Sequence, residues 1–120
     1  MISRRNSKII LIVSLVILTI TITVLSLLPA KSSLNLGEKD KLSHFLAYFV
    51  LTNHVFLLKK ISWGSSWIVL ILIIYGLLLE FLQGFVPGRV SSLLDGLANT
   101  GGVLLGVCAS IIQQKIYEKR

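Results

Sequence analysis

The sequence has little charge and little proline. Only 14% of its 120 residues are charged, 54% are hydrophobic, and there are two prolines. A water-soluble domain of this length keeps much of its surface in contact with water and needs more polar side chains. The composition therefore excludes an ordinary soluble globular domain and indicates a membrane protein.

Cysteine and acidic residues are also scarce. Cys108 is the only cysteine, so an intrachain disulfide is excluded and cysteine usage does not indicate the redox compartment. Five acidic residues stand against twelve Lys and Arg, which leaves a net charge of +7. A basic chain of this kind could bind nucleic acid or anionic lipid, and the distribution of the charge decides between the two.

Long apolar runs make up most of the chain. They cover residues 9–28, 42–58, 67–85 and 93–112. Each is close to the roughly 20 residues that a helix needs to cross about 30 Å of hydrocarbon. An isolated strand is not viable in lipid, because its backbone groups would lack hydrogen-bond partners. We therefore expect an all-α membrane protein, a bundle of four transmembrane helices that forms a single domain over residues 1–120.

The first apolar run has a second interpretation, as a cleaved signal peptide. Its apolar core of twenty residues, 9–28, is too long for that role. The stretch "LLPAKSS" that ends the run also lacks a small-x-small cleavage site. The sequence therefore favours an uncleaved membrane anchor.

Basic residues are divided unequally between the two ends of the predicted bundle. With four crossings, the N-terminus, the 59–66 loop and the C-terminus share one side, which carries eight basic residues and one acid. The other side carries four of each, so the first side holds the whole net charge. The positive-inside rule then predicts that both termini are cytoplasmic. Basic residues in these places orient the chain and contact anionic lipid, so no nucleic-acid partner is expected.

Polar residues embedded in the runs lie near the outer ends of the predicted helices. A charged side chain costs a few kcal/mol at the centre of a membrane helix and less near the interface. Helical spacing also places the polar residues of each helix on one face. We therefore expect these faces to turn inward and form one cluster at the extracytoplasmic side. Its members are Asp40 just before the second run, His44 in that run, Glu80 and Gln83 in the third, Asp95 and Asn99 in the fourth, and Arg89 in the loop between the last two.

Simpler interpretations of the same residues stay open. Ser92 and Asp95 have the spacing of a capping box, so Asp95 could only start a helix. Asp40 fits an N-cap position, and His44 fits a hydrogen-bonded interfacial histidine. Glu80 is harder to explain in this way, because an acid near a helix C-terminus opposes the helix dipole and needs a partner.

Four short motifs occur in a fixed order: D-K-x-x-H at 40–44, E-x-x-Q at 80–83, P-G-R at 87–89 and D-x-x-x-N at 95–99. Over about residues 39–107 the chain resembles the VanZ-like family of small bacterial membrane proteins. The resemblance implies a multi-pass protein of the bacterial cell membrane. The founding member of that family is an accessory factor in glycopeptide resistance, chiefly against teicoplanin. The matching motif residues are Asp40, Lys41, His44, Glu80, Gln83, Arg89, Asp95 and Asn99.

Two functions remain open. In the first, the protein is a membrane-embedded enzyme or binder that acts on an envelope lipid or peptidoglycan precursor, with acid–base and anion-binding groups in the cluster. The catalytic candidates are then Asp40, His44, Glu80 and Asp95, and the substrate-binding candidates are Lys41, Gln83, Arg89 and Asn99. In the second, the protein is non-catalytic, and the polar cluster locks a helix bundle that masks or organises the cell surface.

Other functions have less support. Transport of a small solute is disfavoured, because the inner halves of the runs lack a polar path. No nucleophile elbow, zinc signature or phosphate loop occurs, so we predict no cofactor and assign no metal. A carboxylate–histidine metal site stays open, since the sequence does not give the spacing of ligands across helices.

Overall fold

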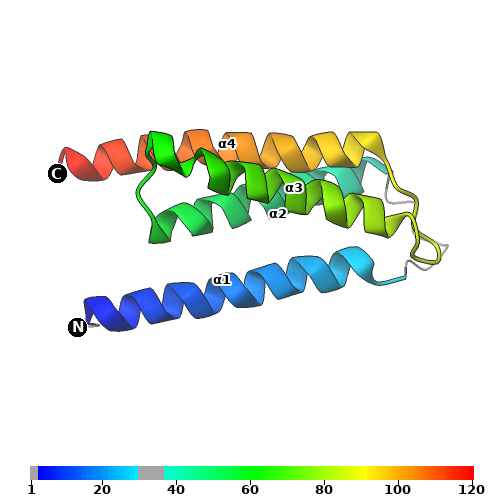
Figure 1. Ribbon diagram of the computed structural model, residues 1–120, viewed down its shortest axis with the longest axis horizontal. Coiled ribbons are helices and arrows are strands. Elements are labelled where there is room, and N and C mark those ends of the chain that lie inside the picture. Colours follow the sequence, from blue (N-terminus) through cyan, green and yellow to red (C-terminus); the bar gives the residue numbers. More distant parts are fainter. Residues whose placement is uncertain (1–2, 30–36) are drawn as a thin grey trace.

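The computed structural model describes residues 3–29 and 37–120, with side chains from residue 41 onward in the second range. These residues form the helices α1 (Arg4–Leu27), α2 (Gly37–Leu58), α3 (Ser66–Gln83) and α4 (Leu93–Glu118) (Figure 1). A 3-10 helix, η1 (Trp63–Ser65), precedes α3. The described part of the chain contains no strand, and the all-α prediction is confirmed.

Among the described residues, three helical segments are long and apolar enough to cross a membrane. They are α1, the continuous η1–α3 segment Trp63–Gln83, and α4. Only 6% of the apolar window of α1 is buried, so most of its aliphatic surface is available to lipid. α2 is not among these candidates, although it has 22 residues. Length and composition thus indicate a membrane protein with three candidate spans, where the sequence predicted four.

The helices extend beyond several of the predicted boundaries. α1 begins at Arg4 rather than residue 9, α2 at Gly37 rather than residue 42, and α4 ends at Glu118 rather than residue 112. Apolar runs mark the part of a helix that suits hydrocarbon, whereas charged residues such as Lys and Glu continue a helix readily. Asp40 consequently lies within α2 and is not the N-cap that we considered.

α2 and α4 run side by side and pack closely through glycines of α4. A Cβ atom on Gly102 would lie 2.3 Å from the carbonyl oxygen of Phe45, and one on Gly106 would lie 2.7 Å from Cβ of Thr52. Small residues spaced four apart allow such close approach of helices in membranes. This contact brings the first turns of α2 and α4 to the same end of the bundle, opposite the two chain termini (Figure 1).

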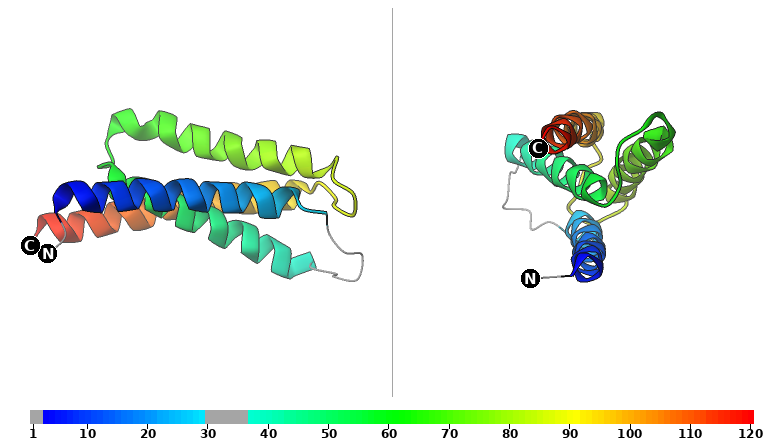
Figure 2. Two further views of the ribbon diagram at one scale, coloured as in Figure 1. Left: turned by 90° about the horizontal axis from the view of Figure 1, so that it is seen from below. Right: turned by 90° about the vertical axis from the view of Figure 1, so that its left-hand side faces the viewer.

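α1 contacts α2 and α3 in the described structure and lies on the opposite side of α2 from α4 (Figure 2). Polar contacts join it to its neighbours along its length. Oγ of Ser14 lies 2.8 Å from Nε2 of His54, and Oγ1 of Thr23 lies 2.8 Å from the hydroxyl of Tyr75. α1 is thus joined by polar contacts to both α2 and α3, each of which contacts all three other helices of the described structure.

Candidate functional site

Three ionisable side chains from three helices meet at the end of the bundle opposite the termini. His44 of α2, Glu80 of α3 and Asp95 of α4 each contribute a nitrogen or carboxylate oxygen, and these atoms all lie within 4.8 Å of one another. The exposed fractions of the three residues are 9%, 5% and 6%. We call this group the His44–Glu80–Asp95 cluster. The sequence predicted that these three residues converge, and the geometry of the described residues agrees.

Glu80 has the partner that its position in α3 requires. Its Oε1 accepts a hydrogen bond of 2.6 Å from the backbone N–H of Ser92, the N-cap residue of α4. The carboxylate thus lies near the C-terminus of α3 but also at the N-terminus of α4, where the helix dipole favours a negative charge. The side chain of Ser92 makes no capping bond. The Ser92 side chain therefore does not form its half of a Ser92–Asp95 capping box, although Asp95 lies in the first turn of α4.

Asn99 orients the imidazole of His44. Oδ1 of Asn99 lies 2.9 Å from Nδ1 of His44, and Nδ2 of Asn99 donates to the carbonyl of Gly76 at 3.1 Å. Because Nδ2 is the donor, Oδ1 is the acceptor, and Nδ1 of His44 carries the hydrogen. In the neutral imidazole the lone pair is then on Nε2. Asn99 was a substrate-binding candidate, and the structure places it behind the histidine, with 2% of its surface exposed.

Gln83 and Arg89 bind the main chain of α1. Nε2 of Gln83 donates to the carbonyl of Ser26 at 2.8 Å. Nε and Nη2 of Arg89 donate to the carbonyls of Leu28 and Leu25, each at 2.9 Å. The last carbonyls of a helix have no partner within it, and an arginine at this position satisfies them and complements the helix dipole. The sequence placed Arg89 beside the carboxylates, whereas the structure uses its guanidinium to cap α1.

The remaining two candidates lie at the start of α2. Lys41 is half-buried three residues before His44. Asp40 belongs to α2 by its backbone, but its side chain lies outside the described residues. The described geometry therefore separates the eight predicted residues into a cluster of three, a set that positions helices or His44 (Gln83, Arg89 and Asn99), and these two.

A cavity of about 300 Å³ opens beside the cluster, between α1, α2 and the end of α3. Its polar lining includes His44, Tyr48, Gln83 and Arg89. Tyr48 is only 1% exposed, and its hydroxyl has no hydrogen-bond partner within the described part of the chain. It had no predicted role, although its spacing of four residues from His44 places both side chains on one face of α2. His44 thus connects the cavity to the two carboxylates.

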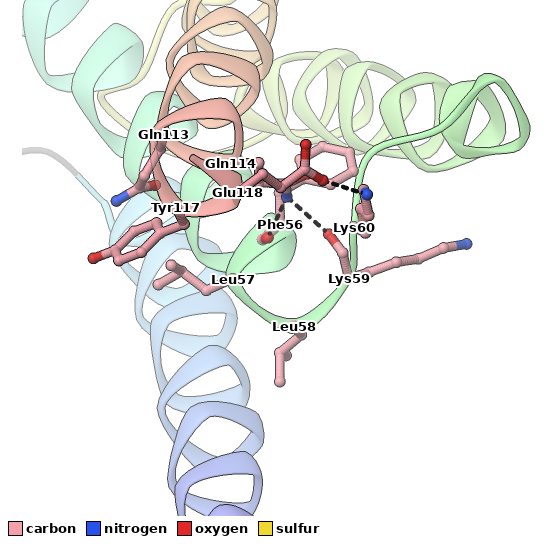
Figure 3. A pocket seen from close by; sticks show the side chains of 9 residues that line it. All are labelled: Phe56, Leu57, Leu58, Lys59, Lys60, Gln113, Gln114, Tyr117 and Glu118. Carbon is pink, nitrogen blue, oxygen red and sulfur yellow. Dashed lines mark hydrogen bonds and ion pairs between the residues drawn. The ribbon is translucent and has the colours of Figure 1, made fainter. Parts of the chain in front are cut away.

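The opposite end of the bundle has a hollow of about 310 Å³ between α2 and α4 (Figure 3). Nε2 of Gln114 donates there to the carbonyls of Phe56 at 3.0 Å and Lys59 at 3.3 Å. The ammonium of Lys60 forms an ion pair with Glu118. Since the amide of Gln114 satisfies carbonyls at the end of α2, these contacts fasten the loop after α2 to α4, and we assign this hollow a structural role.

Comparison with known proteins gives one family. The sequence profile of the VanZ/LLP1 family matches residues 3–114, which is nearly the whole chain. No curated protein matches the sequence. No solved structure matches it either.

Proposed function

The chain belongs to the VanZ/LLP1 family, and from that premise we propose that it crosses the bacterial cell membrane four times, with both termini in the cytoplasm. Both termini lie at one end of the bundle (Figure 1), as an even number of crossings requires. The excess of basic residues at that end supports the cytoplasmic assignment. The His44–Glu80–Asp95 cluster then faces the extracytoplasmic side.

α2 is the proposed fourth span despite its polar residues. Its 22 residues correspond to about 33 Å at 1.5 Å per residue, enough to cross the hydrocarbon. His44 bonds to Asn99, His54 to Ser14, and Asn53 accepts from Ser110 at 3.2 Å. Because these side chains are paired with other helices, the cost of placing them in a membrane is much reduced.

We propose that the cluster binds the polar head of an envelope lipid or a lipid-linked wall precursor. The observation that carries this proposal is the convergence of His44, Glu80 and Asp95 next to a cavity of about 300 Å³. Buried ionic groups often stabilise a protein no better than apolar residues of the same shape. Several titratable groups gathered in a concave, buried site are instead typical of functional sites. Ile22, Leu25 and Ser26 of α1 form part of the cavity wall, and most of the aliphatic surface of α1 is available to lipid.

The chemistry of the cluster suits a ligand with hydroxyl or amine groups. Carboxylates accept hydrogen bonds from such donors, and these charge-assisted bonds are short and strong. The lone pair on Nε2 of His44 can accept a proton from a hydroxyl group or a water molecule. If the cluster binds a wall precursor in this way, the protein would contribute to tolerance of glycopeptides, including teicoplanin, as the family resemblance implies.

The second candidate function is the structural lock. It is favoured by the contacts of Gln83 and Arg89, which join α3 and the following loop to α1 through backbone carbonyls. The bond from Ser92 to Glu80 likewise fastens the start of α4 to α3. In this alternative the polar residues only stabilise a bundle that masks the cell surface, and stability and phenotype change together.

Asp95→Asn separates the two candidates. The substitution keeps the size of the side chain and removes its charge. Teicoplanin susceptibility and folded yield in detergent should be measured on the same variant, beside the matched control Glu118→Gln at the opposite end of the bundle. The proposed site predicts that Asp95→Asn loses tolerance with its yield unchanged, while the control keeps both. Loss of yield and tolerance together would support the structural lock.

A further inference from the structure

We infer that His44, Glu80 and Asp95 form a binding site for a divalent transition-metal ion, with Zn²⁺ as the best fit. The inference rests on the proposed function and deepens it, since it concerns the same cluster, and it assigns a metal ligand that the sequence analysis left open. An imidazole nitrogen and two carboxylate oxygens are common ligands of such ions. Three protein ligands leave one position of a tetrahedral ion open, which is the arrangement of catalytic zinc sites.

The spacing of the ligand atoms is close to what an ion needs. Ligands bound at 2.0–2.2 Å around a tetrahedral ion lie about 3.4 Å from each other. The three atoms of the cluster lie within 4.8 Å of one another. Small rotations of long or rotatable side chains close this difference, and the helices need not move. Each ligand comes from a different helix, so an ion here would also join α2, α3 and α4.

The hydrogen bonds behind the cluster orient its members as a metal site requires. A histidine that binds a metal through one nitrogen almost always donates its other N–H to a carbonyl or carboxylate. Nδ1 of His44 makes such a bond with Oδ1 of Asn99 at 2.9 Å, which assigns Nε2 to the ion. Carboxylate ligands are usually held by a further hydrogen bond as well. Oε1 of Glu80 accepts one from the backbone N–H of Ser92.

Tyr48 provides an independent indication of a ligand. Its side chain is 99% buried, and its hydroxyl has no hydrogen-bond partner among residues 3–29 and 37–120. Side chains on a helix lean towards its N-terminus, and for α2 that direction leads to the cluster. Glu80 is also within electrostatic range of Tyr48. A buried hydroxyl without a partner is costly, so an oxygen atom carried by a bound ion would complete the site.

Charge favours a cation in the same place. Glu80 and Asp95 put two carboxylates within 4.8 Å of each other at positions that are about 95% buried. Two carboxylates at such a distance repel each other when both are ionised. Arg89 also lines the adjacent cavity, but its guanidinium donates to the end of α1. A divalent cation between the two carboxylates would reduce this repulsion, and His44 lines the cavity next to the cluster.

Zinc binding to the purified chain tests the inference without any envelope molecule. The full chain is purified in detergent, stripped with a chelator, dialysed against ZnCl₂ and measured for zinc content and Tm. Zinc is a sensitive probe because a nitrogen–oxygen site binds it more tightly than Mn²⁺ or Fe²⁺. We expect close to one Zn²⁺ per chain and a higher Tm. A content below about a tenth of an equivalent, with no change of Tm, would overturn the inference.

Glu80→Gln is the most informative variant. The amide oxygen of Gln still accepts from the N–H of Ser92, so the structural bond is kept while the anionic ligand is lost. We expect its zinc affinity to fall about 100-fold or more, at least as much as the 10–100-fold loss that follows removal of an outer hydrogen bond. Asp95→Asn provides the same test should Glu80→Gln not fold. The control is His54→Gln at the far end of α2, which should bind zinc as the unmodified chain does.

Two outcomes separate this inference from the function on which it rests. Variants of Glu80 and Asp95 that bind zinc normally would overturn the metal site. A chain that binds no zinc, but whose Asp95→Asn variant still loses glycopeptide tolerance at full yield, would leave the proposed function standing and remove the metal from it.

Discussion

Nδ1 of His44 donates to Oδ1 of Asn99 across 2.9 Å, which joins the third turn of α2 to the second turn of α4. The same amide donates to the carbonyl of Gly76 in α3. One buried side chain thus links three helices and sets the hydrogen position on the histidine. The contact serves stability and the site at once, so its removal should be visible in both.

Asn99→Ala should lower the stability of the fold. The substitution leaves the Nδ1–H of His44 without its buried acceptor, at a cost of roughly 1–3 kcal/mol. Chemical or thermal unfolding in detergent measures the change. The control is Gln113→Ala, an amide on the exposed face of the same helix, which we expect to have a much smaller effect. Equal stability of the two variants would contradict the role of Asn99.

Gly102→Ala should disturb the packing of α2 on α4. Its Cβ would meet the backbone oxygen of Phe45 at 2.3 Å, and a backbone atom cannot turn aside as a side chain can. Overpacking of this kind typically costs about 1–3 kcal/mol. Gly101→Ala is a matched control, because its Cβ would lie 3.6 Å from the Phe45 ring, an ordinary contact. Unfolding free energies should therefore fall for Gly102→Ala and stay level or rise for Gly101→Ala, and the reverse order would contradict the described packing.

Arg89→Lys should loosen α1. The guanidinium uses two nitrogens to reach the carbonyls of Leu25 and Leu28, and a single ammonium does not reproduce that planar geometry. We expect a loss of about 1 kcal/mol and faster hydrogen exchange at the end of α1, both measurable in detergent. If α1 exchanges as in the unmodified chain while glycopeptide tolerance is lost, Arg89 binds a ligand after all, as the sequence suggested.

The sequence predicted the convergence of His44, Glu80 and Asp95 for a physical reason. Charged groups in apolar helices are costly wherever they face lipid, so the helical positions of these residues left only an inward orientation. The apolar runs likewise predicted where helices occur, since a run of that length has few other uses. Neither argument depends on how the helices are placed relative to one another.

The use of Arg89 and Gln83 could not be predicted in the same way. Their partners are backbone carbonyls of α1, and every helix end offers such acceptors whatever its sequence. The placement of α1 beside the end of α3 determines which carbonyls Arg89 and Gln83 bind. The role of Asn99 behind His44 depends on the same kind of information. The glycine contacts of α4 set the axial position of α4 along α2, and this position brings Asn99 next to His44.

The proposed topology can be tested by labelling single cysteines in intact cells. Cys108 is first replaced by alanine, and cysteine is then introduced at Ser91, in the loop before α4, or at Ser66, at the start of α3; both positions are exposed. A membrane-impermeant maleimide should label Ser91→Cys and should label Ser66→Cys only after lysis. Labelling of Ser66→Cys in intact cells would contradict cytoplasmic termini.

Native mass spectrometry of the purified chain with a lipid-linked wall precursor tests most directly whether the cluster is a ligand site. The unmodified chain, Asp95→Asn and Glu118→Gln are titrated with the precursor, and the Tm of each is measured under the same conditions. The account predicts that the unmodified chain and Glu118→Gln bind the precursor equally, while Asp95→Asn binds it at least tenfold more weakly at an unchanged Tm. Equal binding by all three chains, or no binding by any, would contradict it.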